Sequence, residues 1–119
     1  MAVTNENFAD EAMKVMQKMK GSRLTTSQIR KIWGYIVRVY DRARRTQGKM
    51  LDRETVHDLQ YAKMKIYYEA GREQAVKHFV NDAGIIRMID GIGNNKEKFM
   101  LFCNYMESLV AFHKFFERG

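Results

Sequence analysis

The sequence predicts an all-α protein, and three observations carry that prediction. The 119 residues include no proline, the residue that disfavours helix interiors most strongly. Most of the glycines lie near expected helix ends, and apolar residues recur every three or four positions along the chain, which is the helical period. We therefore expect a compact bundle of about five helices, formed by a single domain over residues 1–119.

The first helix is expected over residues 5–20, followed by a break at Gly21 and Ser22. Apolar side chains recur there at the helical spacing that gives one amphipathic face: Phe8, Ala12, Val15, Met16 and Met19. This pattern predicts a helix with one buried and one solvated side.

The second helix is expected over about residues 26–45 and has a clear start signal. Thr25 stands where its hydroxyl can cap the helix, and Gln28 stands three residues later, where its side chain can reach back. Leu24 precedes the cap and is placed to pack on Ile29 as a hydrophobic staple. The sequence therefore predicts a capping box at this position.

Three further helices complete the expected bundle. Asp52 repeats the capping layout for a third helix, whose apolar pattern continues past Gly71 to about residue 80. A short helix capped by Asp82 is expected over residues 83–89. The last helix is expected to begin behind Asn94 and to run to the C-terminus, with its apolar side chains on one side.

The net charge of +7 arises in one quarter of the chain. Residues 23–53 hold nine Lys and Arg against two Asp, which accounts for the whole excess, because residues 1–22 and 54–119 are each balanced. A generally basic protein would scatter its charge, whereas a protein that binds a polyanion concentrates it on one element.

Positive charges form a stripe along the expected second helix. At about 100° per residue, three cations fall within about 40° of Lys31: Arg38, Arg42 and Arg45. They lie opposite the expected apolar face, which comprises Ile29, Ile32, Trp33, Ile36, Val37 and Tyr40. A solvated face is the alternative, but like charges four residues apart repel by a few tenths of a kcal/mol, which favours an anionic partner. Beside the stripe, Gly34 costs up to about 1 kcal/mol in a helix interior, which indicates close approach of a partner to the backbone.

A weaker stripe follows the third helix, where aromatic and basic residues alternate at helical spacing: Tyr61, Lys65, Tyr68 and Arg72. Rings that stack on bases and cations that hold phosphates suit single-stranded nucleic acid. Tyrosines that pack on a neighbouring helix are the alternative.

Enzymatic functions find no support in the sequence. The three histidines do not stand at a metal-ligand spacing, no catalytic or phosphate-loop motif occurs, and Cys103 is the only cysteine. We expect no catalytic residue, metal site, cofactor or small-molecule substrate. No run of about 18 apolar residues and no secretory signal occurs, so we expect a cytoplasmic protein without a membrane partner.

Four strings in the sequence resemble the small subunit of type III-A CRISPR effector complexes, the Csm family. They are LTTSQIRK (24–31), VYDRA (39–43), YYEAGRE (67–73) and FCNYMESLVAFHKFF (102–116). They occur in order and with family-like spacing, so the resemblance covers most of the chain.

The resemblance implies a five-helix bundle that stacks in two or more copies inside a filament-like ribonucleoprotein, where it lines the channel in which target RNA pairs with the guide. It implies no active site, because an RNase backbone subunit cuts the RNA and the large subunit carries DNA cleavage and cyclic-oligoadenylate synthesis. The implied partners are crRNA, target RNA, these two subunits and further copies of itself. The RNA-backbone contacts carried over by position are Arg30, Lys31, Arg38, Arg42, Lys65 and Arg72; Arg45 is added from the helical stripe.

Two other classes of function remain open at this point. A helix-turn-helix-like DNA-binding regulator would need side chains that read base edges, whereas the outer face of the second helix is mostly Arg and Lys. A helical interaction module for an acidic protein would use the same charge. The salt dependence of binding separates that module from a nucleic-acid-binding protein.

Overall fold

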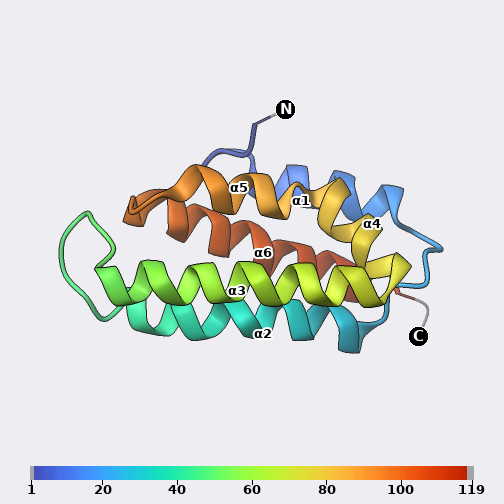
Figure 1. Ribbon diagram of the computed structural model, residues 1–119. Coiled ribbons are helices and arrows are strands. Elements are labelled where there is room, and N and C mark those ends of the chain that lie inside the picture. Colours follow the sequence, from blue (N-terminus) through green and yellow to red (C-terminus); the bar gives the residue numbers. More distant parts are fainter. Residues whose placement is uncertain (1, 118–119) are drawn as a thin grey trace.

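The computed structural model describes residues 2–117, over which the chain forms six helices and no named strand. In chain order these are α1 (Phe8–Lys18), α2 (Thr26–Ala43), α3 (Arg53–Arg72), α4 (Gln74–Ala83), α5 (Ile85–Ile92) and α6 (Lys96–Phe116) (Figure 1). The all-α prediction is confirmed, and the expected number of about five helices is corrected to six within this part of the chain.

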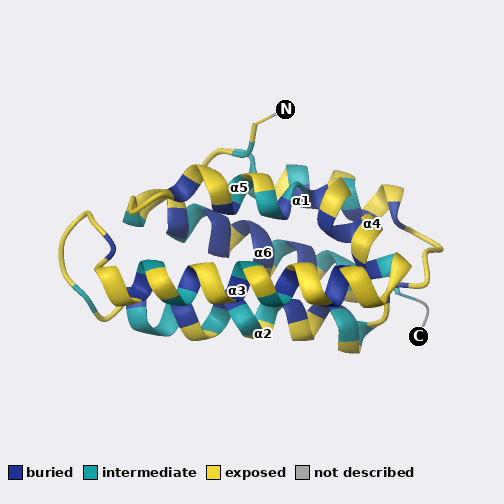
Figure 2. Ribbon diagram, in the orientation of Figure 1, coloured by how far each residue is buried: buried dark blue, intermediate teal, exposed yellow. Residues whose placement is uncertain are grey.

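Helix α6 lies at the centre of the fold. It packs against α1, α2 and α5, while α3 packs against α2 and α4. Helices α2 and α3 run antiparallel, side by side, along one edge of the molecule (Figure 1). The buried positions in Figure 2 turn inward toward α6, and the largest fully buried side chains include Tyr105, Phe79, Phe99 and Phe102. The apolar spacing in α6 thus supplies the centre of the core.

The predicted capping box at the start of α2 is confirmed. The Thr25 hydroxyl accepts a hydrogen bond from the Gln28 backbone N–H at 3.1 Å, and the Gln28 side chain accepts one from the Thr25 N–H at 2.9 Å. Asp52 caps α3 in the predicted way, accepting from the Thr55 N–H at 2.8 Å. Hydrogen bonding from Thr55 lowers the pKa of the Asp52 carboxyl. Both long helices therefore begin where local sequence dictates.

Replacing Thr25 by alanine is expected to lower the free energy of unfolding by about 1 kcal/mol, the usual loss for an N-cap. The cause is the Gln28 N–H, which loses its acceptor. Urea denaturation measures the change. The control is Ser27→Ala, which removes an exposed hydroxyl in the first turn of the same helix; an equal loss there would mean that the cap contributes nothing specific.

The expected third helix divides at Glu73, which adopts an extended conformation (φ −132°, ψ 122°) and separates α3 from α4. The predicted short helix begins at Ile85 and not at residue 83, so the expected Asp82 cap is wrong. Gly84 has a left-handed conformation (φ 67°) that ends α4 and reorients the chain into α5. Glycine adopts this conformation without the penalty that a Cβ brings.

The start of the last helix is displaced by one residue from the prediction. Asn95, not Asn94, caps α6 by accepting from the Lys98 N–H at 2.9 Å. The Asn94 carbonyl instead accepts from the Leu51 N–H at 2.8 Å, beside an isolated antiparallel bridge between Met50 and Asn95. These bonds attach the loop after α2 to the turn before α6.

The buried face of α2 is turned away from the predicted one. Val39 and Ala43 are buried with the isoleucines, whereas Trp33, Val37 and Tyr40 are only half-buried. Periodicity alone does not show which helices surround α2, and α2 packs on both α3 and α6. The cationic stripe consequently lies along the α3 side of α2, and not opposite the core as expected.

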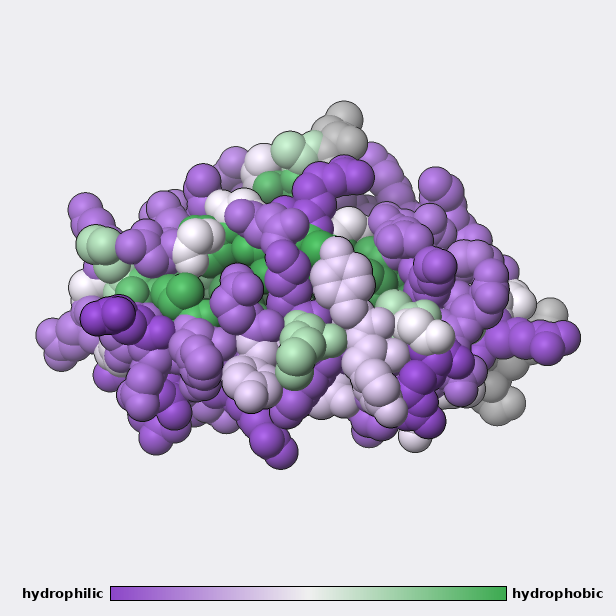
Figure 3. Space-filling model, in the orientation of Figure 1, coloured by the Kyte–Doolittle hydropathy of each residue, from purple (hydrophilic) through white to green (hydrophobic). Residues whose placement is uncertain are grey.

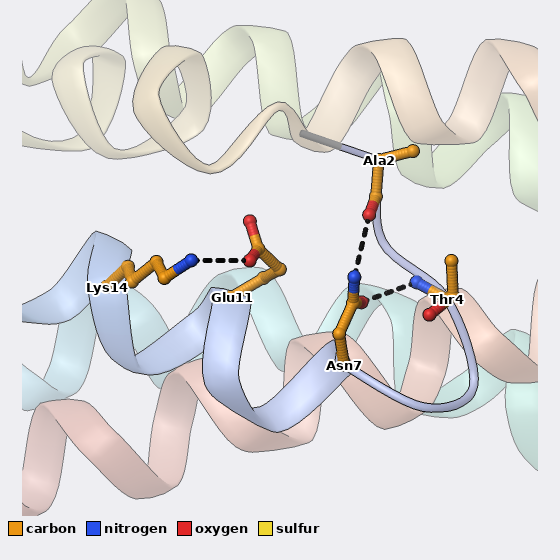
Figure 4. Close-up of polar contacts among 5 residues, drawn as sticks. All are labelled: Ala2, Thr4, Asn7, Glu11 and Lys14. Atoms are coloured by element: carbon orange, nitrogen blue, oxygen red, sulfur yellow. Dashed lines mark hydrogen bonds and ion pairs between the residues drawn. The ribbon is translucent and has the colours of Figure 1, made fainter.

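The N-terminal segment is joined to α1 through Asn7 (Figure 4). The Asn7 side chain donates to the Ala2 carbonyl at 3.0 Å and accepts from the Thr4 N–H at 2.6 Å. Within α1, Lys14 and Glu11 form an ion pair at 3.0 Å. Each of these contacts joins residues close in sequence, so they order the chain locally.

Candidate nucleic-acid interface

The antiparallel α2–α3 pair positions all of the predicted RNA-binding residues. Four of them lie on α2 (Arg30, Lys31, Arg38 and Arg42), two on α3 (Lys65 and Arg72), and Arg45 lies just beyond the end of α2. Packing between the two helices brings the α2 stripe and the α3 stripe to one edge of the molecule.

A shallow groove of about 300 Å³ separates the two helices and collects three of these cations. Its lining consists of Tyr35, Arg38, Val39, Arg42, Asp58, Tyr61, Ala62 and Lys65. Two tyrosine rings and three positive side chains thus surround one depression. This combination can accept a phosphate together with a flat apolar group.

Two cations of the groove, Lys65 and Arg38, can bind an external anion because they form no ion pair within the described chain. Lys65 lies over the rings of Tyr35 and Tyr61, at 5.5 and 6.0 Å from their centroids. Cation–π contacts of this kind orient the ammonium group and leave its N–H donors unused. Among residues 2–117, no carboxylate lies within ion-pair distance of Lys65 or Arg38. Arg38 is exposed.

Arg42 has internal partners. Its guanidinium lies 2.9 Å from the Glu54 carboxylate and 3.3 Å from that of Asp58, both on α3. The expected repulsion between Arg38 and Arg42 is therefore offset within the chain. Repulsion alone does not require an external anion, and a phosphate at Arg42 would compete with two carboxylates.

Glu69 organises the opposite end of the helix pair. It is 7% exposed, and its carboxylate accepts from the Tyr35 hydroxyl at 2.8 Å. Lys31 lies at 3.1 Å and Arg72 at 3.5 Å from the same carboxylate. Burial acts to raise the pKa of Glu69, but the hydrogen bonds from Tyr35 and Lys31 outweigh it, so the pKa is lowered. Glu69 is therefore ionised at neutral pH and holds Lys31 and Arg72 near each other.

Arg30 and Arg45 extend the basic surface beyond the groove. Arg30 is exposed on α2. The Arg45 side chain donates to the Asp41 carbonyl at 2.9 Å, which directs it back along the end of α2. The structure therefore unites Arg38, Arg42 and Lys65 in one groove and Lys31 with Arg72 in a second cluster, with Arg30 and Arg45 outside both.

The outer face of α3 is more apolar than the sequence indicated. Tyr61 and Tyr68 are 52% and 64% exposed, and Arg72 lies over the Tyr68 ring at 5.6 Å. Met64 and Tyr67 are 55% and 56% exposed beside them. Figure 3 shows weakly polar and apolar atoms over α3, set among charged side chains. Tyr61 and Tyr68 are thus not buried against a neighbouring helix, although Tyr61 lines the groove beside α2.

Sequence reasoning missed the three α3 carboxylates that contact the cations. Glu54 and Asp58 are four residues apart, which places them on one face of a helix. Two long helices joined by one loop lie antiparallel. The spacing of Glu54 and Asp58 could therefore have predicted that both carboxylates lie beside the cations of α2. Across the described part of the chain, no cluster of His, Cys, Asp and Glu could hold a metal ion. In the same residues, no helix is long and apolar enough to cross a membrane.

Comparison with known proteins identifies the family. A family model described as Csm2 Type III-A matches residues 3–118. The "CRISPR system Cms protein Csm2" of Streptococcus thermophilus is 37% identical over 119 residues, which cover 96% of this chain and 94% of the relative. The protein of the same name from Mycobacterium tuberculosis (strain ATCC 25618 / H37Rv) is 31% identical over 120 residues, covering 98% and 97%. Members of the family are the non-catalytic small subunit of the type III-A system. Residues throughout the described chain thus confirm the resemblance of the four strings, and the chain belongs to the Csm2 family of type III-A CRISPR systems.

Proposed function

We propose that the chain binds the backbones of guide and target RNA within a type III-A CRISPR effector complex, without reading their sequence. The observation that carries this proposal is the α2–α3 edge, where Arg38 and Lys65 project charge that no carboxylate among residues 2–117 neutralises. Base pairing between guide and target supplies sequence specificity in RNA-guided systems. The protein then needs only charge and shape to hold the strands.

The chemistry of the surface supports backbone contact over base reading. Arginine and lysine side chains bind phosphates and, among the bases, chiefly guanine, whereas reading the other bases relies on groups such as those of Asn and Gln. The exposed positions near Arg38 offer few such groups. Binding is therefore expected to be similar for unrelated RNA sequences.

The partners follow from this role. We propose that the chain assembles in the cytoplasm, as one helical domain, with crRNA, target RNA, the large subunit, the RNase backbone subunit and further copies of itself. The exposed apolar side chains of α3 adjoin the basic edge and offer it contacts of a second chemistry.

A helix-turn-helix regulator is less well supported. Its two helices cross at about 90–120° and are joined by a turn of roughly 3–4 residues. Here α2 and α3 lie antiparallel, and residues 44–52 separate them. Neither helix is presented in the way that entry into a major groove requires.

Binding of the purified chain to unrelated single-stranded RNAs, measured by fluorescence anisotropy across a salt series, tests the proposal. If two to five phosphates are contacted, the logarithm of the binding constant is expected to fall against the logarithm of salt with a slope of about −1.4 to −3.5. Equal affinities for the RNAs would confirm sequence independence. A flat salt response, or a strong preference for one duplex DNA, would contradict the proposal. An acidic protein partner would then account for the charge.

Neutralising the internal competitors of Arg42 is expected to strengthen RNA binding. The double variant Glu54→Gln/Asp58→Asn removes both carboxylates that contact its guanidinium. We expect an increase in affinity of about threefold to tenfold, because two surface ion pairs are weak competitors. Anisotropy titrations at constant salt measure it.

A matched control is Glu6→Gln/Asp82→Asn, which removes one Glu and one Asp from exposed positions outside the α2–α3 edge. The control raises the net charge by the same amount. If both double variants strengthen binding equally, the gain comes from total charge, and Arg42 has no specific part in it.

A further inference from the structure

Gly34 lies at an exposed position in the middle of α2. Neither a contact nor the backbone conformation in the described chain requires glycine there. Its backbone is helical, with no positive φ. A Cβ built on it would meet no heavy atom within 4 Å. Glycine weakens a helix interior relative to alanine, and no internal contact compensates for it here. The reason for glycine therefore lies in something outside this chain.

Three of the four residues that lie three or four positions from Gly34 are cations, and the fourth, Val37, is half-buried. Arg30 and Lys31 lie four and three positions before it and Arg38 four positions after it, so all three adjoin it on the helix surface. Arg30 and Arg38 are about 12 Å apart along the helix axis, and Gly34 lies midway between them in the same row. An anion that contacts both arginines passes over Gly34.

We propose that the sugar–phosphate backbone of an RNA strand crosses α2 at Gly34, in van der Waals contact with the helix backbone. The inference rests on the proposed function and deepens it by naming the point of contact. With no side chain at Gly34, the strand can approach the helix closely enough for Arg30, Lys31 and Arg38 to reach its phosphates at hydrogen-bond distance. A larger residue would lift the strand away from all three.

The surroundings favour a nucleic acid over a protein helix as the occupant. A protein helix that packs on a glycine needs apolar side chains around the contact. In residues 2–117, the exposed large apolar side chains lie on α3 and elsewhere, and none of them lies on α2. The face around Gly34 instead carries positive charge, which suits a phosphodiester.

The test compares stability with RNA affinity in Gly34→Ala and Gly34→Leu. Both are expected to unfold at higher urea concentrations than the wild type, because both residues favour helix. Gly34→Leu is expected to bind unrelated single-stranded RNAs about tenfold more weakly, the effect of losing roughly one charged hydrogen bond, and Gly34→Ala less so. Gly91 supplies the control, since it is exposed in α5 and a Cβ there also meets nothing within 4 Å. Gly91→Leu is expected to leave RNA binding unchanged.

Arg38→Glu, measured in parallel, separates failure of this inference from failure of the proposed function. If Arg38→Glu weakens RNA binding while folded Gly34→Leu binds like the wild type, the crossing point is wrong and the proposed function stands. If Arg38→Glu also binds like the wild type, the proposed function is wrong. Should Gly34→Leu keep its RNA affinity but fail to join the other subunits, the glycine serves a protein contact, which overturns the inference.

Discussion

The double variant Arg38→Glu/Lys65→Glu is expected to bind single-stranded RNA about a hundredfold more weakly than the wild type, since each charged contact contributes roughly tenfold. Both side chains line the α2–α3 groove, and neither has a carboxylate partner among the described residues. Reversal thus replaces two available cations by two repulsive charges. The slope of the salt dependence is also expected to become shallower by about 1.4, at roughly 0.7 for each lost phosphate contact.

The matched control is Arg87→Glu/Lys77→Glu, which changes the net charge equally on exposed residues of α5 and α4. It is expected to retain most of the affinity, because charges beyond the Debye length of about 8–10 Å are largely screened. Equal losses in both variants would show that only total charge matters. Far-UV circular dichroism of each variant verifies that the helices are intact.

Features fixed by neighbouring residues were predictable from the sequence. The starts of α2 and α3 depend on Thr25 and Asp52, whose bonds close within three residues. The concentration of cations on α2 was predictable because it follows from the number of Lys and Arg residues in that part of the sequence. The break between α3 and α4 was missed because the apolar pattern continues past Gly71, whereas the chain is extended at Glu73 and a new helix buries Val76 and Phe79.

The sequence indicated which cations lie on α2 and α3, but not which of them contact carboxylates. Helical geometry placed Lys31, Arg38 and Arg42 in one stripe, yet Lys31 and Arg42 meet different carboxylates of α3 and only Arg38 and Arg42 line the groove. Such pairs join residues more than ten positions apart, so they depend on how two helices pack. Periodicity also gave an apolar face of α2 that included Trp33, Val37 and Tyr40, whereas packing against α3 and α6 buries Val39 and Ala43 instead. The rotation of a helix about its axis is a tertiary property, and it decides which cations remain available.

The largest expected loss of stability comes from Phe102→Ala. Phe102 is fully buried on α6, the helix that contacts α1, α2 and α5. Its truncation removes buried apolar surface and leaves a cavity, which lowers the free energy of unfolding by about 3–5 kcal/mol. Urea denaturation monitored by circular dichroism measures this change. Because domains of this size are stable by only about 5–15 kcal/mol, much of the protein's stability would be lost.

Phe115→Ala provides the control on the same helix, because Phe115 is 78% exposed and its ring contacts that of Phe116 at 5.1 Å between centroids. It is expected to cost less than about 1 kcal/mol, as surface substitutions do. Comparable losses at the two positions would contradict the central place of α6 in the core. If the expected difference holds, the position of the basic edge depends indirectly on the burial of Phe102, because α6 packs against α2. Phe102→Ala is then expected to weaken RNA binding only at urea concentrations that unfold it, whereas the Arg38→Glu/Lys65→Glu variant loses binding while folded.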